Sequence, residues 1–308
     1  MKRLLLAATL ALFAAPASAP AAPPAMPQMK IAITFDDLPS HARLPPDTTR
    51  VEIASRIIAA LKDAHSPPVY GFVNGLRLVD DPPSAPVLAL WRDAGFPLGN
   101  HTYSHMSLSA NPLDAWSADT VKGEDAIAPL MTGEDWHWLR YPYLAEGETL
   151  MKHLGGRAFL AAKGYRIAAV TMSFDDYLWN DPYARCVAKH DAATIATMET
   201  AYLAAAEASL AYYHDLSMQL YGRDIPYVLL MHLGAFDARM LPRLLALYAA
   251  KGVAFVALDE AESDPFYAAQ IDPRLPPTPA SLEQAMLARG VNFTPRNVQV
   301  LPFDRLCR

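Results

Sequence analysis

Residues 30–41 read "KIAITFDDLPSH", an apolar run that ends in two adjacent carboxylates. The continuous apolar stretch from Ile31 to Ile33 is typical of a strand that is buried on both faces. Asp36 and Asp37 follow side by side, and their like charges repel unless a cation, a metal ion or water offsets the repulsion. The end of this strand is therefore the first place to look for a functional site.

Further short apolar runs alternate with helical patterns, which predicts a parallel sheet covered by helices on both sides. A (β/α) barrel and a doubly wound sheet both fit this alternation. No G-x-G-x-x-G or Walker pattern is present, which disfavours the nucleotide-binding forms of these folds. Residues 47–65 are expected to form a helix with Asp47 as its N-cap. The expected strands are residues 30–35, 69–73, 97–99, 166–173, 227–231 and 253–258.

The first residues are typical of an export signal. Lys2 and Arg3 precede an apolar stretch, residues 4–15, that is short for a membrane span, and small residues follow it. We interpret residues 1–22 as a signal peptide and 23–28 as a Pro/Ala linker, with an uncleaved membrane anchor as the alternative. The expected location is periplasmic or secreted, with no stable membrane insertion after cleavage.

Without the signal peptide the chain keeps 24 basic and 32 acidic residues, a net charge of −8. This acidity argues against nucleic acid as a partner. In an exported chain, Cys186 and Cys307 could form one disulfide that ties the C-terminal tail to the body, the alternative being two free, buried thiols.

The rest of the chain is expected to form one domain, residues 29–262, with a C-terminal extension, residues 263–308, packed on it. Residues 182–224 are rich in Ala and Tyr and are interpreted as a helical insertion. In the extension, Ser281 and Gln284 form a capping-box pair that predicts the start of a short helix.

In folds of this kind, reactive side chains lie just past the carboxyl ends of the strands. His101 and His105 follow one predicted strand in "GNHTYSHMSLS", and two histidines at this spacing on one face of a helical turn can reach a single ion. A carboxylate from another strand end would complete a His₂Asp set with open positions, as catalytic sites have. Two surface histidines without a ligand are the alternative.

The adjacent carboxylates then have separate uses. One would bind the cation, and its neighbour would stay free to accept a proton from a water made acidic by the metal. Arg140 could orient the free carboxylate, and His232, at the end of another strand, is the candidate acid for the leaving amine. His41 and the remaining histidines have no spacing that predicts a role.

These residues resemble the NodB-homology polysaccharide deacetylases, carbohydrate esterase family four, over about residues 30–260. The family's motif T-F-D-D is similar to residues 34–37, H-[ST]-x-x-H to 101–105, and R-x-P-[FY] to 140–143, and a leucine two before a histidine matches 230–232. The resemblance implies a distorted (β/α) barrel with fewer than eight strands, in a single α/β domain. It also implies one divalent metal ion, most typically zinc, with cobalt as the other option.

The resemblance further implies a role for each matched residue. The implied metal ligands are Asp37, His101 and His105, and the implied catalytic residues are Asp36 as base, His232 as acid and Arg140 as the residue that orients the base. The backbone N–H of Tyr143 is implied to help hold the oxyanion.

The fourth motif, D-x-x-[DS]-W, is matched only in part. Asp175 and Trp179 fit it, but Leu178 stands where the family has the residue that tunes the acidic histidine. We expect Asp175 to assist His232, Asp176 to be a solvated turn carboxylate, and Trp179 to form a wall of the acetyl pocket with Leu230, ordinary core packing of Trp179 being the alternative.

The predicted function is that of an exported metal-dependent N-deacetylase, which would hydrolyse the acetamide of an N-acetylated amino sugar in a poly- or oligosaccharide. One alternative is a metal-dependent hydrolase of another non-peptide C–N bond or of an O-acetyl ester on a small molecule. Another is a carbohydrate-binding pseudoenzyme, which is disfavoured because base, ligands and acid are all present.

Overall fold

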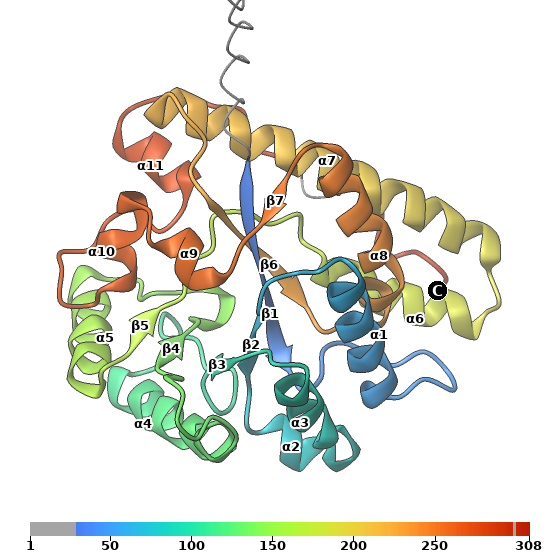
Figure 1. Ribbon diagram of the computed structural model, residues 1–308, viewed down its shortest axis with the longest axis horizontal. Coiled ribbons are helices and arrows are strands. Elements are labelled where there is room, and N and C mark those ends of the chain that lie inside the picture. Colours follow the sequence, from blue (N-terminus) through green and yellow to red (C-terminus); the bar gives the residue numbers. More distant parts are fainter. Residues whose placement is uncertain (1–28, 298–299) are drawn as a thin grey trace, which may run out of the picture.

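The computed structural model describes residues 29–297 and 300–308. The predicted signal peptide and linker lie outside the described residues. Seven parallel strands form one sheet (Figure 1): β1 (Lys30–Leu38), β2 (Tyr70–Val73), β3 (Leu98–Asn100), β4 (Trp138–Leu139), β5 (Arg166–Ile167), β6 (Tyr227–His232) and β7 (Ala254–Phe255).

The sheet curls into a half-barrel. Its strand order is β5-β4-β3-β2-β1-β6, and β7 pairs with the start of β1, at Lys30 and Ile31. The chain leaves β5 at one edge of the sheet and reaches the other edge within a few residues, where Met172 forms a bridge with Leu229 of β6. The α/β class and the distorted barrel with fewer than eight strands are therefore confirmed.

Helices surround this sheet (Figure 1). The longer ones are α1 (Arg50–Asp63), α3 (Pro86–Asp93), α4 (Leu113–Gly123), α5 (Leu150–Lys163), α6 (Tyr177–Ala188), α7 (Ala192–Tyr221) and α8 (Ala235–Ala250). Short helices are α2 (Arg77–Asp80), α9 (Leu258–Glu262), α10 (Ala268–Ile271) and α11 (Leu282–Ala288).

The stretch at residues 30–41 begins with β1, which is an interior strand of the sheet. Residues 31–38 of β1 are all buried, because β1 has strands on both sides and the buried Arg140 contacts its Thr34 and Asp36. The apolar side chains of β1 pack with those of α1, α3 and α8 in one large core that includes Phe35, Ile57, Trp91 and Leu244. This burial leaves Asp36 and Asp37 as the polar members of a buried strand end.

Several boundaries differ from the prediction. The N-cap of α1 is Thr49, whose side chain accepts from the backbone N–H of Glu52, and not Asp47. The strands expected over 166–173 and 253–258 shrink to two residues each, since each segment pairs with its neighbour at two residues only. Strand β4 was not among the expected strands, because its two residues, Trp138 and Leu139, are too few to form an apolar run.

The C-terminal extension packs on the domain through buried contacts. The Arg157 guanidinium, on α5, donates to the carbonyls of Ala269, Asp272 and Leu275. Helix α11 lies against α7 and begins at Ser281, whose hydroxyl accepts from the backbone N–H of Gln284, as the capping-box pair predicted.

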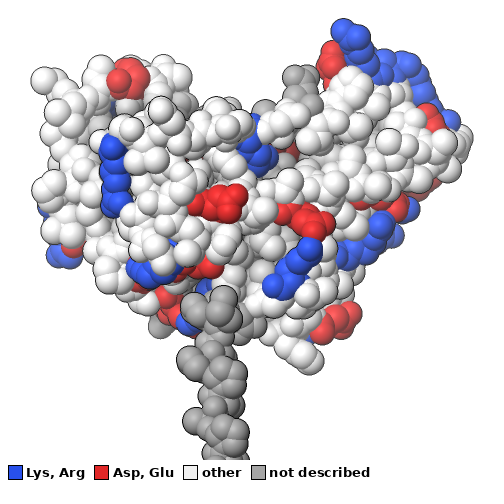
Figure 2. Space-filling model, turned by 90° about the horizontal axis from the view of Figure 1, so that it is seen from above, with Lys and Arg blue, Asp and Glu red and all other residues white. Residues whose placement is uncertain are grey.

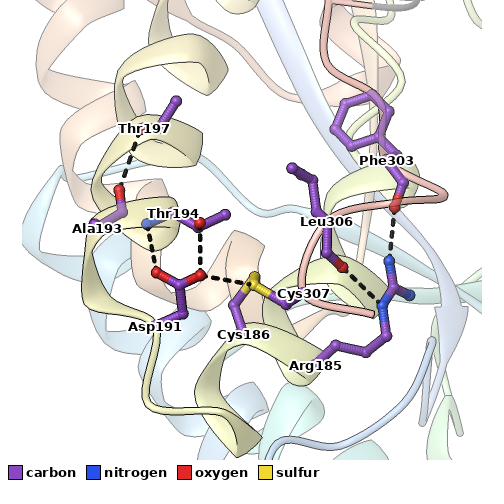
Figure 3. Close-up of a disulfide and its surroundings, with 9 residues drawn as sticks. All are labelled: Arg185, Cys186, Asp191, Ala193, Thr194, Thr197, Phe303, Leu306 and Cys307. Atoms are coloured by element: carbon purple, nitrogen blue, oxygen red, sulfur yellow. Dashed lines mark hydrogen bonds between the residues drawn. A yellow bond between two sulfur atoms is a disulfide. The ribbon is translucent and has the colours of Figure 1, made fainter.

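A disulfide fixes the end of the extension. Cys186 on α6 is bonded to Cys307, with their Cα atoms 5.0 Å apart, so the predicted pairing is confirmed (Figure 3). Figure 3 also shows Arg185 donating to the carbonyls of Phe303 and Leu306, at 2.6 and 3.1 Å. The tail is thereby joined to α6 by one covalent bond and two charged hydrogen bonds.

On the face shown in Figure 2, acidic and basic side chains lie among many uncharged ones. Among the described residues, none of the helices has the length and apolar character that crossing a membrane requires.

Candidate active site

The carboxylate of Asp36 is paired with a buried arginine. Asp36 lies at the end of β1, directly opposite His232 in the β1–β6 register. The Arg140 Nη1 donates to both Asp36 oxygens, at 3.1 and 3.3 Å. Both side chains are almost fully buried, at 0 and 3% exposure, so the orientation of this pair is not disturbed by solvent.

Other contacts hold Arg140 in place. Its Nε donates to the Ala168 carbonyl, and its Nη2 donates to the Thr34 hydroxyl and the Ala169 carbonyl. The guanidinium also lies 4.6 Å from the centre of the Phe72 ring. Because all three nitrogens of the planar guanidinium are engaged, Arg140 holds the Asp36 carboxylate in one orientation.

The three predicted ligands come together beside this pair. The Asp37 Oδ1 lies 3.4 Å from Nε2 of His105 and 3.7 Å from Nε2 of His101. One potential ligand atom from each of the three residues lies within 4.8 Å of the others.

The two histidines do not share a helical turn, contrary to the prediction. Residues 101–107 form a loop after β3, in which Thr102 and His105 have φ values of +60° and +59°. Asn74 holds this loop by donating to the carbonyls of His101 and Thr102, and the rings of the two histidines are 4.8 Å apart. The loop, not a helix, brings them together.

The surroundings of both histidines suit a role as metal ligands. The Arg140 carbonyl accepts from Nδ1 of His101 at 2.8 Å, so the Nε2 lone pair of that histidine is left for a ligand. Burial lowers the pKa of His105 to about 4, which keeps its imidazole neutral as a ligand must be.

The carboxylate of the cluster also fits. Burial would raise the pKa of Asp37, but the hydrogen bond from His41 and the neighbouring imidazoles bring that pKa well below its usual range. Its Oδ1 is buried without a hydrogen-bond partner among the described residues. An ionised, buried oxygen beside two imidazole nitrogens is a donor set that suits a divalent ion such as zinc.

The partner of His232 is Asp176, so the expectation for Asp175 was wrong. The Asp176 Oδ1 lies 3.0 Å from Nδ1 of His232, and its Oδ2 accepts from the backbone N–H of the same residue at 2.6 Å. Asp176 is fully buried at the start of α6, and not a solvated turn residue as we had expected. Burial alone would lower the pKa of His232, but Asp176 overcomes this and raises the pKa to about 10.

Asp175 faces a different partner. It has a φ of +58°, and its carboxylate accepts from Nη2 of Arg296, in the C-terminal extension, at 2.7 Å. The positive φ turns the chain between the two aspartates, so only one of them can reach His232.

The expected pocket role of Trp179 was also wrong. Trp179 is 1% exposed and packs in the core against Tyr202, Phe236 and Phe303. Trp179 lies on α6, one turn after Asp176, and its ring packs in the core between helices. The core-packing alternative is the observed one.

The site opens into a cavity of about 710 Å³. Asp36, Asp37, His101, His105 and His232 line it, together with the predicted Tyr143 and Leu230. The remaining lining residues are His41, Leu144, Val170, Thr171, Met172, Ser173, Asp175, Tyr177, Tyr213, Ser281, Glu283 and Arg296.

Three residues that shape this site were not predicted from the sequence: His41 and Arg296, which line the cavity, and Asp176, which lies behind His232. Asp176 carried a signal, since it stands beside Asp175, but the wrong member of the pair was chosen. His41 stands only four residues after Asp37, yet nothing in that spacing predicts the hydrogen bond that joins them. Arg296 is far from every motif in sequence and reaches the cavity only because the extension folds back.

The fold and these side chains define a class of protein: a (β/α) half-barrel that combines an Asp-His-His cluster, an Asp-Arg pair and an Asp-His pair in one cavity. Residues 24–158 match the model of the polysaccharide deacetylase family. The predicted resemblance to the NodB-homology polysaccharide deacetylases of carbohydrate esterase family four is confirmed over these residues.

One similar protein is a chitin deacetylase of Arthroderma benhamiae, strain ATCC MYA-4681 / CBS 112371. It is 32% identical over 81 residues, which are 26% of this chain and 22% of that protein. The matched segment thus spans less than a quarter of that relative.

Solved structures show the same fold. The chitin deacetylase of the fungal pathogen Colletotrichum lindemuthianum is 19% identical with a TM-score of 0.51, over 76% of this chain and 87% of that one. The peptidoglycan deacetylase PdaC of Bacillus subtilis is 18% identical with a TM-score of 0.50, over 77% and 91%. BA3943 of Bacillus anthracis, a pseudoenzyme of the family, has a TM-score of 0.52 at 13% identity, over 76% and 66%. Because enzymes and a pseudoenzyme share it, the fold alone does not decide activity.

Proposed function

We propose that this protein is an exported, metal-dependent N-deacetylase that releases acetate from N-acetylated amino sugars in a poly- or oligosaccharide. The observation that carries the proposal is the Asp-His-His cluster beside a carboxylate that is held by Arg140. Family relatives that are chitin and peptidoglycan deacetylases support the substrate class.

Asp37, His101 and His105 would hold the ion, zinc by preference and cobalt as the other option. When bound, the ion would supply Lewis-acid chemistry, which polarises the acetamide carbonyl and makes the attacking water more acidic. Asp36 lies beside this cluster and is held by Arg140 and not by the ion. Its carboxylate therefore remains available as a base.

Asp36 accepts the proton of the attacking water at a carboxylate oxygen. The ion pair with Arg140 keeps that oxygen aimed at the cluster, since the guanidinium has no freedom to turn. The new C–O bond forms at the acetamide carbon, and the backbone N–H of Tyr143 is the proposed donor to the carbonyl oxygen. Leu230 provides an apolar surface for the acetyl methyl group.

His232 gives the proton that the leaving nitrogen needs. Its Nδ1 is engaged by Asp176, so Nε2 is the atom that donates to the sugar amine as the C–N bond breaks. A pKa of about 10 keeps His232 protonated at neutral pH, where an acid is required. Acetate and the free amino sugar leave as products.

The test uses the mature, zinc-loaded chain with N-acetylglucosamine oligomers, and it measures released acetate. We expect turnover that a chelator abolishes and zinc restores. Absence of turnover on a panel of acetylated glycans, with glycan binding retained, would contradict the proposal and favour a pseudoenzyme. The His232→Ala chain is the matched control, because it should keep zinc and lose rate.

A second candidate is a hydrolase of small acetylated molecules, acting on another C–N bond or on an O-acetyl ester. It is favoured by the contribution of Ser281, Glu283 and Arg296 to the cavity wall. The cavity volume of about 710 Å³ lies within the roughly 300–1,000 Å³ of sites that enclose one small ligand. Faster acetate release from mono- or disaccharides and small esters than from long oligomers would support this candidate.

A further inference from the structure

His41 occupies a position that the proposed reaction leaves without a role. It lines the cavity, and its Nδ1 lies 2.8 Å from Oδ2 of Asp37. Its ring centre is also 4.7 Å from that of His232. The side chain is 15% exposed, so this contact is sheltered from water.

The two oxygens of Asp37 are used differently. Oδ2 accepts the hydrogen bond from His41, whereas Oδ1 has no hydrogen-bond partner among the described residues and is the oxygen nearest His101 and His105. An imidazole N–H that holds one oxygen leaves the other free for a cation. The histidine therefore selects which oxygen of the carboxylate faces the cluster.

The loop that carries His41 is itself fixed. The backbone N–H of Ser40 donates to the Asp37 carbonyl at 2.9 Å, which closes a turn between the two side chains. Arg50, on α1, donates to the carbonyls of His41 and Ala42 at 2.7 and 2.6 Å. The imidazole is thus supported from behind, as groups that orient metal ligands are.

We propose that His41 is a positioning residue for the metal ion: its Nδ1–H holds Asp37 so that Oδ1 alone binds the ion, together with His101 and His105. This inference rests on the proposed metal site, but it is independent of which acetylated compound is the substrate. Loss of the contact frees the carboxylate to rotate, and partners of this kind are worth about 10–100-fold in metal affinity.

The experiment measures the zinc affinity of the mature chain by competition with a fluorescent chelator, with no substrate present. His41→Ala should weaken zinc binding about 10–100-fold. His41→Asn, whose amide nitrogen replaces Nδ1, should stay close to wild type. His41→Gln, whose amide nitrogen lies where Nε2 was, should behave like His41→Ala.

His214→Ala is the matched control, because His214 pairs with Asp224 at 2.9 Å at a distance from the cavity. It should leave zinc affinity unchanged. If His41→Ala does not fold, as judged by circular dichroism of the metal-free chain, the contrast between the Asn and Gln variants decides. Zinc affinity equal to wild type in His41→Ala, or an equal loss in the Asn and Gln variants, would overturn the proposal. Absence of deacetylase activity would contradict the proposed function, but it would not change the zinc affinities expected here. The two proposals can therefore fail separately.

Discussion

Two of the three pairs of adjacent aspartates in the chain, Asp36-Asp37 and Asp175-Asp176, lie at the same site. In the first pair, Asp36 contacts Arg140, and Asp37 contacts His41 and the ligand histidines. In the second pair, Asp176 contacts His232, and Asp175 contacts Arg296. In each pair one residue has a positive φ, +63° at Asp37 and +58° at Asp175, and the two carboxylates diverge.

This comparison shows how neighbouring anions avoid repelling one another. The backbone turn sends each carboxylate to a different cation or N–H donor, so both can be buried with partners. The two pairs differ in which part of the chain supplies their partners. For the first pair all contacts lie within the barrel, whereas Asp175 depends on the C-terminal extension. The first pair should therefore carry the chemistry and the second should combine chemistry with substrate binding.

The largest effects are expected from substitutions in the first pair, and they should differ between Asp36 and Asp37. Asp36→Asn should reduce kcat/KM about 10²–10⁴-fold, because it removes the base, while zinc content stays at one ion per chain. Asp37→Asn should lose the zinc as well as the rate. Acetate release and elemental analysis of the same preparations measure both. Equal loss of zinc in the two variants would show that the pair does not divide its roles.

The next effect concerns the buried member of the second pair. Asp176→Asn should lower kcat about 10²-fold, because it removes the charge that keeps His232 protonated. The acid form of His232 exists below its pKa, which is raised to about 10, so a lower pKa moves the alkaline limb of the kcat–pH profile to lower pH. A profile with an unmoved alkaline limb would contradict the Asp176–His232 assignment.

The other member of that pair should matter less. Asp175→Asn should change KM by less than about tenfold and leave kcat nearly unchanged, since its contact is with Arg296 at the cavity wall. The alkaline limb of the pH profile should stay in place. A drop in kcat as large as that of Asp176→Asn would restore the role that the sequence motif suggested for Asp175.

The smallest effect on the reaction is expected from opening the disulfide. Cys307→Ser should lower the free energy of unfolding by about 2–5 kcal/mol, because Cys186–Cys307 closes a loop across 121 residues. It should raise KM only a few-fold at temperatures where the protein stays folded, through the wall residues Arg296 and Glu283. Thermal unfolding and steady-state kinetics measure the two effects. A loss of zinc in this variant would contradict the separation between barrel and extension.

Much of the fold was predictable because its signals are local. Buried parallel strands are continuous apolar runs, and the positions of polar residues after β1, β3 and β6 follow from the rule that parallel strands end at one edge. The strands β4, β5 and β7 were missed or overextended, because two-residue strands make too few contacts to leave a pattern in the sequence.

The site was predictable where a residue's role depends on its own strand. Asp36, Asp37 and His232 reach the cavity directly from strand ends, and Arg140 reaches Asp36 from the end of β4, so a motif locates them. The choice between Asp175 and Asp176 depends on one backbone dihedral angle, which no residue type specifies there. Arg296 and His41 depend on how distant or irregular segments return to the cavity, and those paths are set by tertiary contacts.

The most direct test of this account is the crystal structure of the zinc-loaded mature protein with anomalous scattering data at the zinc edge. One zinc ion is expected at about 2.0–2.2 Å from Oδ1 of Asp37 and from Nε2 of both His101 and His105. Asp36 should remain paired with Arg140 and unbound. A zinc ion that lacks either histidine, or one that is bound by Asp36 in place of Asp37, would contradict it.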